Sequence, residues 1–479
     1  MITPRFIVFL LAAYTTLLFG LRILGPSNLT DNDQERPAAY VVDAVRNGHW
    51  IVQYDWTGDI TSKPPAYSWL AALVSLPFSQ PNLFSLYLPC ALAMFGAAAL
   101  LAKLSTEVGH PRLGFLAGLF LLANPLAAKL VALARTDPLF TFTVTLTAVL
   151  VFRAWQSGRG WPLAWLAAGF ATLTKGPLGL VLGFAGLIAW FWERRIGAPS
   201  PASRRHVLGF GLWLAVCLGW FLLAWTAAGP PLIQKMLGAE LVRHAVGMPG
   251  STPGSGLVIA PAYFLSRFLP WSALTLVGVW QAFRSPPTDP TLRQLQRFCL
   301  AWWIAGLVVF GLASHQRGDL IAPLLPAGAL LAAIPASRWT ANWRPRTLLA
   351  ASTSFAVLLA LGTQFEFTQK NRAVFEETRS LAALATAFRQ SGHDLAKLQH
   401  VDPPYALQFF LGTMNRIVTA EVGAQHLQAS RGHTLAVRDA SALERALGAD
   451  AARLRVVATQ TTTPPQTPVR LLALDPASP

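Results

Sequence analysis

Long apolar runs recur along the first three quarters of the chain, separated by short polar segments. A helix that crosses the bilayer core requires roughly 20 apolar residues. Hydropathy predicts about eleven such spans, at residues 6–24, 83–103, 113–131, 138–155, 161–173, 176–192, 207–227, 259–283, 298–313, 319–336 and 346–363. The apolar segment 66–78 is shorter and follows two prolines, so we predict a helix near the membrane interface. The pattern predicts a polytopic α-helical membrane protein.

The pattern changes at about residue 365, where charged residues become frequent. Amphipathic segments near 374–391, 404–412, 422–430 and 440–448 alternate with β-rich runs near 397–401, 416–419, 433–437, 453–459 and 469–474. This alternation is typical of a small α/β domain. We therefore predict a transmembrane domain at 1–364 and a C-terminal α/β domain at 365–479.

Composition agrees with a membrane protein, because 53% of the 479 residues are hydrophobic and only 13% are charged. The net charge of +16 raises the alternative of nucleic-acid binding. However, most Lys and Arg residues fall in every second loop, as the positive-inside rule predicts for a cytoplasmic N-terminus. These loops carry Lys103/Arg112, Arg153/Arg159, Arg194/Arg195/Arg204/Arg205, Arg284/Arg293/Arg297 and Arg338/Arg344/Arg346. We expect no nucleic-acid partner, a plasma (inner) membrane location, and loops 30–65 and 228–258 outside together with the C-terminus.

The first outer loop carries an unusual set of charges directly after the first span. Asp33, Glu35 and Arg36 lie at its start, and Lys63 precedes Pro64-Pro65 at its end. Charge at a membrane boundary is unfavourable unless it is paired, hydrated or bound to a ligand. Asp33 beside a basic group suits a general base, or it caps a helix. Lys63 is a candidate phosphate ligand, or a lysine that snorkels to the interface.

Three further outer segments carry candidate residues. Asp137 precedes a proline and either binds a cation or donor sugar, or simply starts a helix. Lys175, in Thr-Lys-Gly-Pro, is a candidate phosphate ligand or another snorkelling lysine. Arg317 is poised to bind a phosphate with its guanidinium fork, or to form an exposed pair with Asp319.

The glycine-rich loop 228–258 carries Arg243 and His244. Its composition predicts a loop that orders on substrate binding. His244 is a candidate metal ligand, although a lone histidine is usually not one.

Taken in order, these motifs resemble a known group of enzymes over about residues 30–335. The matching elements are Asp33-Gln34-Glu35-Arg36, Ser62-Lys63-Pro64-Pro65, Thr174-Lys175-Gly176-Pro177, Leu269-Pro270-Trp271-Ser272 and the segment Arg317 to Ala327. The chain resembles the multi-span GT-C glycosyltransferases that use a polyprenyl-phosphate sugar donor. Within them it is similar to the aminoarabinose (lipid A) transferases and the protein-mannosyltransferase superfamily.

The resemblance implies an inverting sugar transfer on the outer face to a lipid, glycan or protein acceptor. It implies catalytic roles for Asp33, Glu35 and Asp137, donor-phosphate binding by Arg36, Lys63, Lys175, Arg243 and Arg317, and metal binding by His244 and Asp137. Ser62 replaces a glutamate that relatives use in a metal site, so a divalent cation stays an open alternative. Two rival functions also remain: a transporter or flippase for an anionic lipid or solute, and a non-catalytic binder of lipid-linked sugar.

Overall fold

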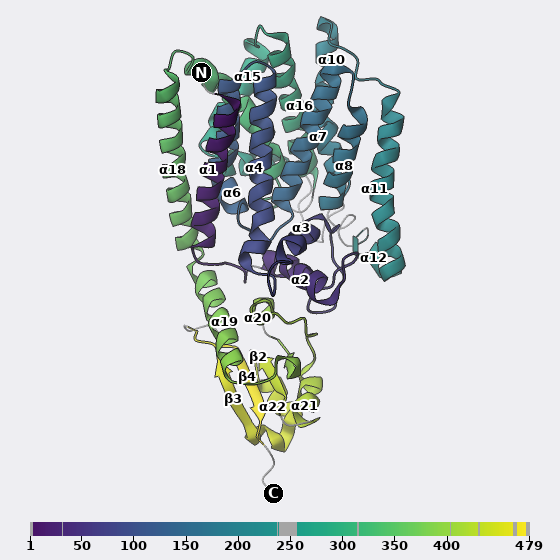
Figure 1. Cartoon of the computed structure of the whole chain (residues 1–479), viewed down its shortest axis with the longest axis vertical. Helices are drawn as coiled ribbons and strands as arrows, with labels where there is room; N and C mark the ends of the chain where they lie inside the picture. The colour runs from purple at the N-terminus through teal and green to yellow at the C-terminus, as the bar shows by residue number, and fades with distance from the viewer. Residues whose placement is uncertain are drawn as a thin grey trace. The chain divides into compact units, whose positions relative to one another are not determined.

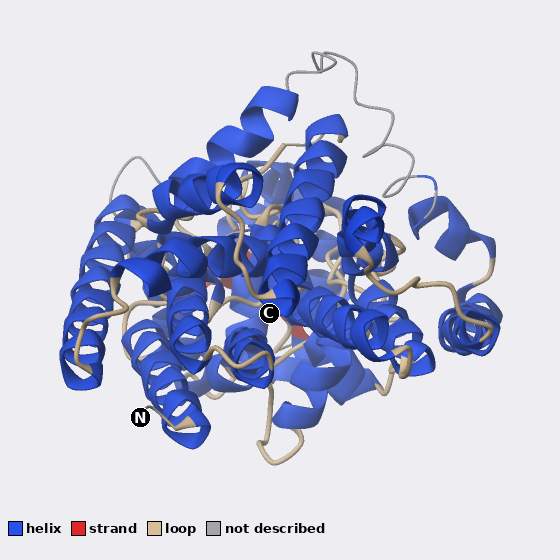
Figure 2. Cartoon of the chain, turned by 90° about the horizontal axis from the view of Figure 1, so that it is seen from above, coloured by secondary structure: helices blue, strands red, loops and turns tan. Residues whose placement is uncertain are grey.

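A computed structural model describes residues 3–30, 32–236, 238, 256–313, 316–402, 404–429, 432–462 and 467–475. The chain divides into two compact units. Unit 1 contains residues 1–22, 62–70 and 87–367, and unit 2 contains residues 23–61, 71–86 and 368–479. Figure 2 shows that most of the described chain is helical.

Six helices of the described chain are long and apolar enough to cross a membrane. They are α1 (Pro4–Ile23), α4 (Leu83–Glu107), α7 (Asp137–Ser157), α11 (Arg205–Ala228), α16 (Pro290–Leu312) and α18 (Pro345–Lys370). A seventh span results if α14 (Gly256–Arg267) and α15 (Trp271–Arg284), which meet at a bend of 118°, are counted as one. Each coincides with a predicted span, so the membrane-protein class is confirmed, while the count of about eleven remains a prediction.

The other predicted spans contain helices that are shorter or interrupted. The segment 113–131 divides into α5 (Pro111–Leu122) and α6 (Pro125–Leu130), because the Asn124 side chain caps α6 and Pro125 starts it. The next predicted spans contain α8 (Trp161–Lys175), α9 (Leu178–Phe184), the 3₁₀ helix η1 (Ala185–Ala189) and α10 (Trp190–Glu193). The segment 319–336 contains the 3₁₀ helix η4 (Ala322–Leu324) and α17 (Leu325–Trp339). Further short helices of this region are α3 (Ala66–Ser75), η2 (Arg194–Ile196) and α12 (Pro230–Ile233).

Burial separates central from peripheral helices of the bundle. About 78% of the apolar window of α7 is buried, compared with 17% for α11 and 22% for α18. The outward faces of α11 and α18 carry large apolar side chains such as Leu208, Leu222 and Leu358. Because such faces are stable only in a non-polar surrounding, these helices have the character of lipid-facing elements.

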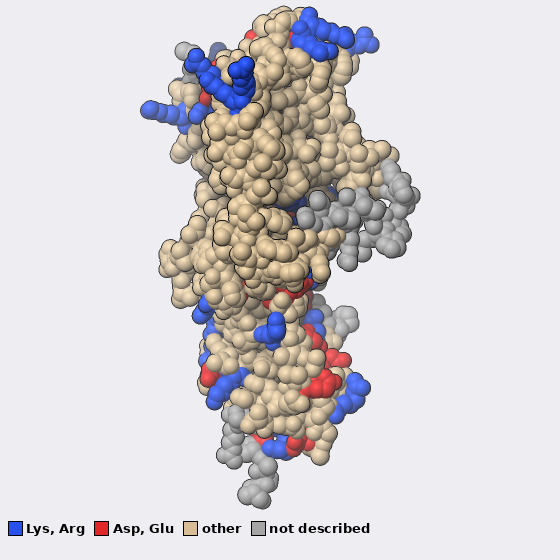
Figure 3. Space-filling view, turned by 90° about the vertical axis from the view of Figure 1, so that its right-hand side faces the viewer, with Lys and Arg blue, Asp and Glu red and all other residues tan. Residues whose placement is uncertain are grey.

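Basic residues gather at one end of the bundle. Figure 1 draws the N-terminus, α10 and the start of α18 at the same end, and Figure 3 shows Lys and Arg side chains there. Below them, most of the visible face carries uncharged side chains (Figure 3). This distribution is typical of a membrane protein with basic loops on one side.

Unit 2 combines helix α2 (Asn32–Asn47) with the C-terminal elements. The helices of its C-terminal part are α19 (Arg372–Gln390), η5 (Leu395–Lys397), α20 (Tyr405–Leu411), α21 (Ala420–Ala429), α22 (Ser441–Leu447) and η6 (Gly448–Arg453). The strands are β1 (Leu398–His400), β2 (Thr434–Val437), β3 (Leu454–Thr459) and β4 (Arg470–Leu474), in the sheet order β1-β2-β4-β3. Within this described sheet, β1 and β2 pair in parallel, and the pairs β2–β4 and β4–β3 are antiparallel.

The core of this sheet lies between β2 and the helices α21 and α22. Leu435 and Val437 of β2 pack with Leu427 of α21 and with Leu443 and Leu447 of α22. Every residue of β2 is buried, as expected for a central strand. The predicted strand 416–419 forms only an isolated bridge between Ile417 and His400.

Candidate functional site

A largely buried chain of alternating charges lies in unit 1. Lys175 Nζ donates a hydrogen bond to Asp137 Oδ1, and Arg135 Nε lies 3.3 Å from Asp137 Oδ2. Arg135 Nη1 also donates to Asp319 Oδ2 at 2.5 Å, and Lys129 Nζ donates to the same oxygen at 2.8 Å. We call these five residues, together with Lys63, which acts electrostatically on Asp137, the charge cluster. The sequence order of its members conceals it, because Lys129 and Asp319 are 190 positions apart.

Local structure explains why these side chains meet. Gly176, with φ of 85°, ends α8 directly after Lys175, and this left-handed conformation is one that glycine adopts readily. Asp137 is the first residue of α7, and the loop before it is tied to α4 by Cys90. The Cys90 thiol lies 2.9 Å from the Leu133 carbonyl oxygen and 3.4 Å from that of Arg135. The cluster is thus held by helix ends and one anchored loop.

Burial makes the cluster energetically important. The side chains of Arg135, Asp137 and Asp319 are each 8% exposed or less, and that of Lys175 is 15% exposed. Charges removed from water in this way are stable only when they are paired and hydrogen-bonded. The sequence also allowed Asp319 to form only a weak, exposed ion pair. In the structure, this carboxylate is instead buried between two cations.

The cluster carries an excess of positive charge. Lys63 also acts electrostatically on Asp137, so four cations accompany two carboxylates. An excess of two positive charges in a poorly hydrated position suits a phosphate group. Within the described ranges, no group of three or more His, Cys, Asp or Glu residues is arranged to hold a metal ion.

A second group of predicted site residues lies in unit 2, on α2. The Glu35 carboxylate is buried and accepts a hydrogen bond from the Ala406 backbone N–H at 3.0 Å. Ala406 is the second residue of α20, whose own capping position, Pro404, offers no side-chain acceptor. Glu35 therefore caps α20 from a distant part of the chain, a contact that stabilises the positive end of a helix.

Asp33 and Arg36 lie nearer the surface of unit 2. Asp33 is partly buried in the first turn of α2. Arg36 Nε lies 3.6 Å from Asp55 Oδ2, and its guanidinium also donates to the Tyr405 hydroxyl. Burial, followed by the charge of Asp55, raises the pKa of Tyr405. The Arg36 side chain remains 53% exposed, so it is accessible to a ligand.

The structure thus brings some of the predicted residues together. Lys63, Asp137 and Lys175 share the charge cluster of unit 1, while Asp33, Glu35 and Arg36 share α2 of unit 2. Arg317 lies in the turn that precedes Asp319, and its carbonyl accepts from the Leu320 N–H. Arg243 and His244 lie outside the described residues.

Sequence reasoning assigned no site role to Lys129, Arg135 or Asp319. Lys129 could have been recognised from the sequence as a candidate, because it is an isolated cation inside a predicted span. Arg135 and Asp319 were visible in their motifs, but only the fold shows that they pair with each other.

The comparisons with known proteins agree with this architecture. Residues 62–225 match the family model described as dolichyl-phosphate-mannose-protein mannosyltransferase. An undecaprenyl phosphate-alpha-4-amino-4-deoxy-L-arabinose arabinosyl transferase 2 of Pseudomonas fluorescens is 28% identical over 66% of this chain and 54% of its own length. The corresponding transferase of Pseudomonas savastanoi pv. phaseolicola is 29% identical over 67% of this chain and 60% of its own length. In sequence, the chain therefore spans somewhat more than half the length of these relatives.

Solved structures show the same fold. ArnT from Cupriavidus metallidurans in the apo state has a TM-score of 0.73 and 18% identity, with 97% of both chains covered. The same protein bound to undecaprenyl phosphate has a TM-score of 0.70 and 17% identity over 97% of both chains. An oligosaccharyltransferase of Archaeoglobus fulgidus has a TM-score of 0.52 and 13% identity over 91% of this chain and 70% of its own.

These findings confirm the predicted fold: the chain is a multi-span membrane protein with the fold of the ArnT and oligosaccharyltransferase structures. The predicted resemblance to the aminoarabinose transferases and to the protein-mannosyltransferase superfamily is confirmed as well.

Proposed function

We propose that this protein is an integral-membrane glycosyltransferase that transfers a sugar from a polyprenyl-phosphate donor to an acceptor. The observation that carries the proposal is the buried charge cluster with its excess of two positive charges. The donor's phosphate is an anion throughout the reaction, and it becomes the leaving group. Fixed cations in a poorly hydrated site stabilise such a charge more effectively than water does. The fold is shared with a structure that contains undecaprenyl phosphate, which supports this class of donor.

The reaction would be an inverting displacement. Asp33 orients an acceptor hydroxyl and accepts its proton, while the oxygen attacks the anomeric carbon of the donor sugar. The bond between that carbon and the phosphate oxygen breaks, and polyprenyl phosphate leaves. The proposed phosphate ligands are Lys63, Lys175 and Arg317, together with Arg36 and Arg243.

We further propose an inner-membrane protein with about eleven spans, whose active site and C-terminus face outward. The gathering of basic residues at one end of the bundle supports this orientation, because positively charged loops remain in the cytoplasm. Residues 1–364 would form the catalytic transmembrane domain. Residues 365–479 would form an outward-facing α/β domain that contributes to acceptor choice.

The direct test incubates purified full-length protein with labelled undecaprenyl-phosphate sugars, with and without lipid, glycan or protein acceptors. We expect acceptor-dependent release of free undecaprenyl phosphate. Binding of the donor without release would favour the non-catalytic binder. Movement of intact donor across a vesicle membrane would favour the flippase.

Asp33→Asn tests the proposed base. It should abolish transfer, because an amide cannot accept the proton, while the thermal midpoint of unfolding stays unchanged. Asp475→Asn is the matched control, since Asp475 is 56% exposed in a surface pair with Arg455, and it should retain full turnover. Turnover of Asp33→Asn close to that of the control would refute the assignment.

A further inference from the structure

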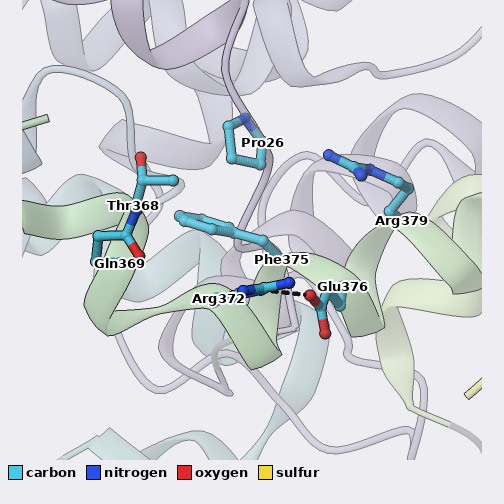
Figure 4. A pocket seen from close by; sticks show the side chains of 7 residues that line it. All are labelled: Pro26, Thr368, Gln369, Arg372, Phe375, Glu376 and Arg379. Carbon is cyan, nitrogen blue, oxygen red and sulfur yellow. Dashed lines mark hydrogen bonds and ion pairs between the residues drawn. The ribbon is translucent and has the colours of Figure 1, made fainter. Parts of the chain in front are cut away.

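Unit 2 contains a surface depression that the proposed transfer reaction does not use. Its empty volume is about 610 Å³, including the open mouth, and it is lined by Pro26, Thr368, Gln369, Arg372, Phe375, Glu376 and Arg379. Figure 4 shows Pro26 and Phe375 between Arg379 on one side and Thr368 and Gln369 on the other. The depression therefore combines an apolar floor with a polar and basic rim.

The lining follows from the periodicity of α19. Arg372, Phe375 or Glu376, and Arg379 are spaced by three or four residues, so they share one face of the helix. Phe375 is 4% exposed and forms the floor. Arg372 Nε donates to Glu376 Oε1 at 2.8 Å, which holds this guanidinium on the rim beside the carboxylate.

The charges of the lining do not cancel. The lining contains two arginines and a single carboxylate, and Glu376 is already paired with Arg372. Arg379 is exposed and adds a second guanidinium to the rim. Two guanidinium groups beside hydroxyl and amide side chains form a suitable environment for a phosphate, which arginine binds through two parallel hydrogen bonds.

The position of the depression indicates where that phosphate comes from. Thr368 and Gln369 belong to the last turn of α18, a helix long and apolar enough to cross the membrane, whose final residue is Lys370. The site thus begins where a membrane-length helix ends, and the ends of such helices are where lipid headgroups are expected. An apolar floor under a basic rim also matches a headgroup that continues into hydrocarbon.

We propose that this depression binds the phosphate headgroup of an anionic membrane lipid. The lipid's phosphate contacts Arg372 and Arg379, and its glycerol region covers Phe375 and Pro26. Such a lipid would anchor the start of α19 at the membrane surface. The site requires neither the sugar donor nor the charge cluster, so it stands independently of the proposed transfer reaction.

Native mass spectrometry of the delipidated full-length protein in detergent tests the proposal. Phosphatidylglycerol should bind more tightly than phosphatidylcholine. Each arginine near a charged lipid surface contributes about 1 kcal/mol, so Arg379→Gln should weaken phosphatidylglycerol binding about fivefold and Arg372→Gln/Arg379→Gln about 30-fold. Arg445→Gln, an exposed arginine on α22 of the same unit, is the matched control and should change binding by less than twofold.

Three results would overturn the proposal. Equal binding of the two lipids would exclude headgroup recognition. An equal loss in Arg445→Gln would show a general effect of net charge. Displacement of the lipid by an equal concentration of inorganic phosphate would show that the site takes free phosphate instead. All measurements omit the sugar donor, so failure of the transfer reaction does not affect them.

Discussion

Asp137→Asn should be among the most destabilising single changes in unit 1, because it removes the carboxylate shared by two buried cations. One oxygen of Asp137 accepts from Lys175, and the other faces Arg135. The amide keeps the size of the side chain, but it turns an acceptor oxygen into a donor that faces a cation. Removing one partner of a buried ion pair typically destabilises by about 3–5 kcal/mol. Asp319 still pairs with Arg135, so we expect a value near the lower end, about 3 kcal/mol.

A double-mutant cycle separates the pair from its surroundings. Lys175→Gln alone should destabilise by about 1–2 kcal/mol, since Asp137 keeps Arg135 as a partner. In the double variant, the neutral pair no longer leaves an unbalanced charge. The losses should therefore be non-additive, with a coupling free energy of about 1–3 kcal/mol.

The free energy of unfolding can be measured by titration with a denaturing detergent, followed through the fluorescence of the 17 tryptophans. Glu107→Gln provides the matched control. Glu107 pairs with Arg153 at 2.7 Å, but the two side chains are 42% and 31% exposed, so its loss should stay below about 1 kcal/mol. Equal losses in Asp137→Asn and Glu107→Gln, or a coupling energy near zero, would refute the view that the charge cluster is a buried, cooperative unit.

Two further predictions concern unit 2. Burial lowers the pKa of His400 to about 3, and neither ring nitrogen has a hydrogen-bond partner. In the unfolded state the pKa of histidine is about 6.5. Between these two pH values, the unfolded state therefore binds more protons than the folded state. Stability is therefore fully present above pH 6.5 and should fall by up to about 1.4 kcal/mol per pH unit below it; His400→Leu should flatten this dependence of the unfolding midpoint between pH 4 and 7. Glu35→Ala should destabilise by about 1–2 kcal/mol through loss of the α20 cap, whereas Glu35→Gln keeps an acceptor for the Ala406 N–H and should lose less. If Glu35→Gln folds normally but lacks transfer activity, Glu35 has a catalytic role beyond its capping contact.

The long helices could be predicted from the sequence because a membrane span is a property of composition over about 20 residues. The interrupted helices could not be predicted in this way. Hydropathy is averaged over a window of residues. The break at Asn124-Pro125 instead depends on the Asn124 side chain, which caps α6, and on Pro125, which has no backbone N–H to donate. In the C-terminal part, four short strands lie within a residue or two of the predicted runs, because turn residues separate them clearly.

Less of the candidate site could be predicted from the sequence. Motif spacing identified Asp137 and Lys175 individually, but not that they are partners 38 positions apart. The capping contact of Glu35 had no local signal, since its acceptor role depends on a helix 371 positions further along the chain. Contacts of this kind arise from tertiary structure alone, and a charged residue read in isolation does not reveal whether it serves a ligand or a neighbouring helix.

The presence of two carboxylates in a site proposed to bind phosphate has a physical explanation. Four cations placed close together in a poorly hydrated position would repel one another strongly. Asp137 and Asp319 alternate with the cations, so they reduce this repulsion and hold each cation in a fixed direction before the donor arrives. Preorganised charges of this kind need little rearrangement when the leaving phosphate forms. Since both oxygens of Asp137 face cations, this residue is better suited to position Lys175 and Arg135 than to accept a proton. Asp33, outside the charge cluster, therefore remains the stronger candidate for the base.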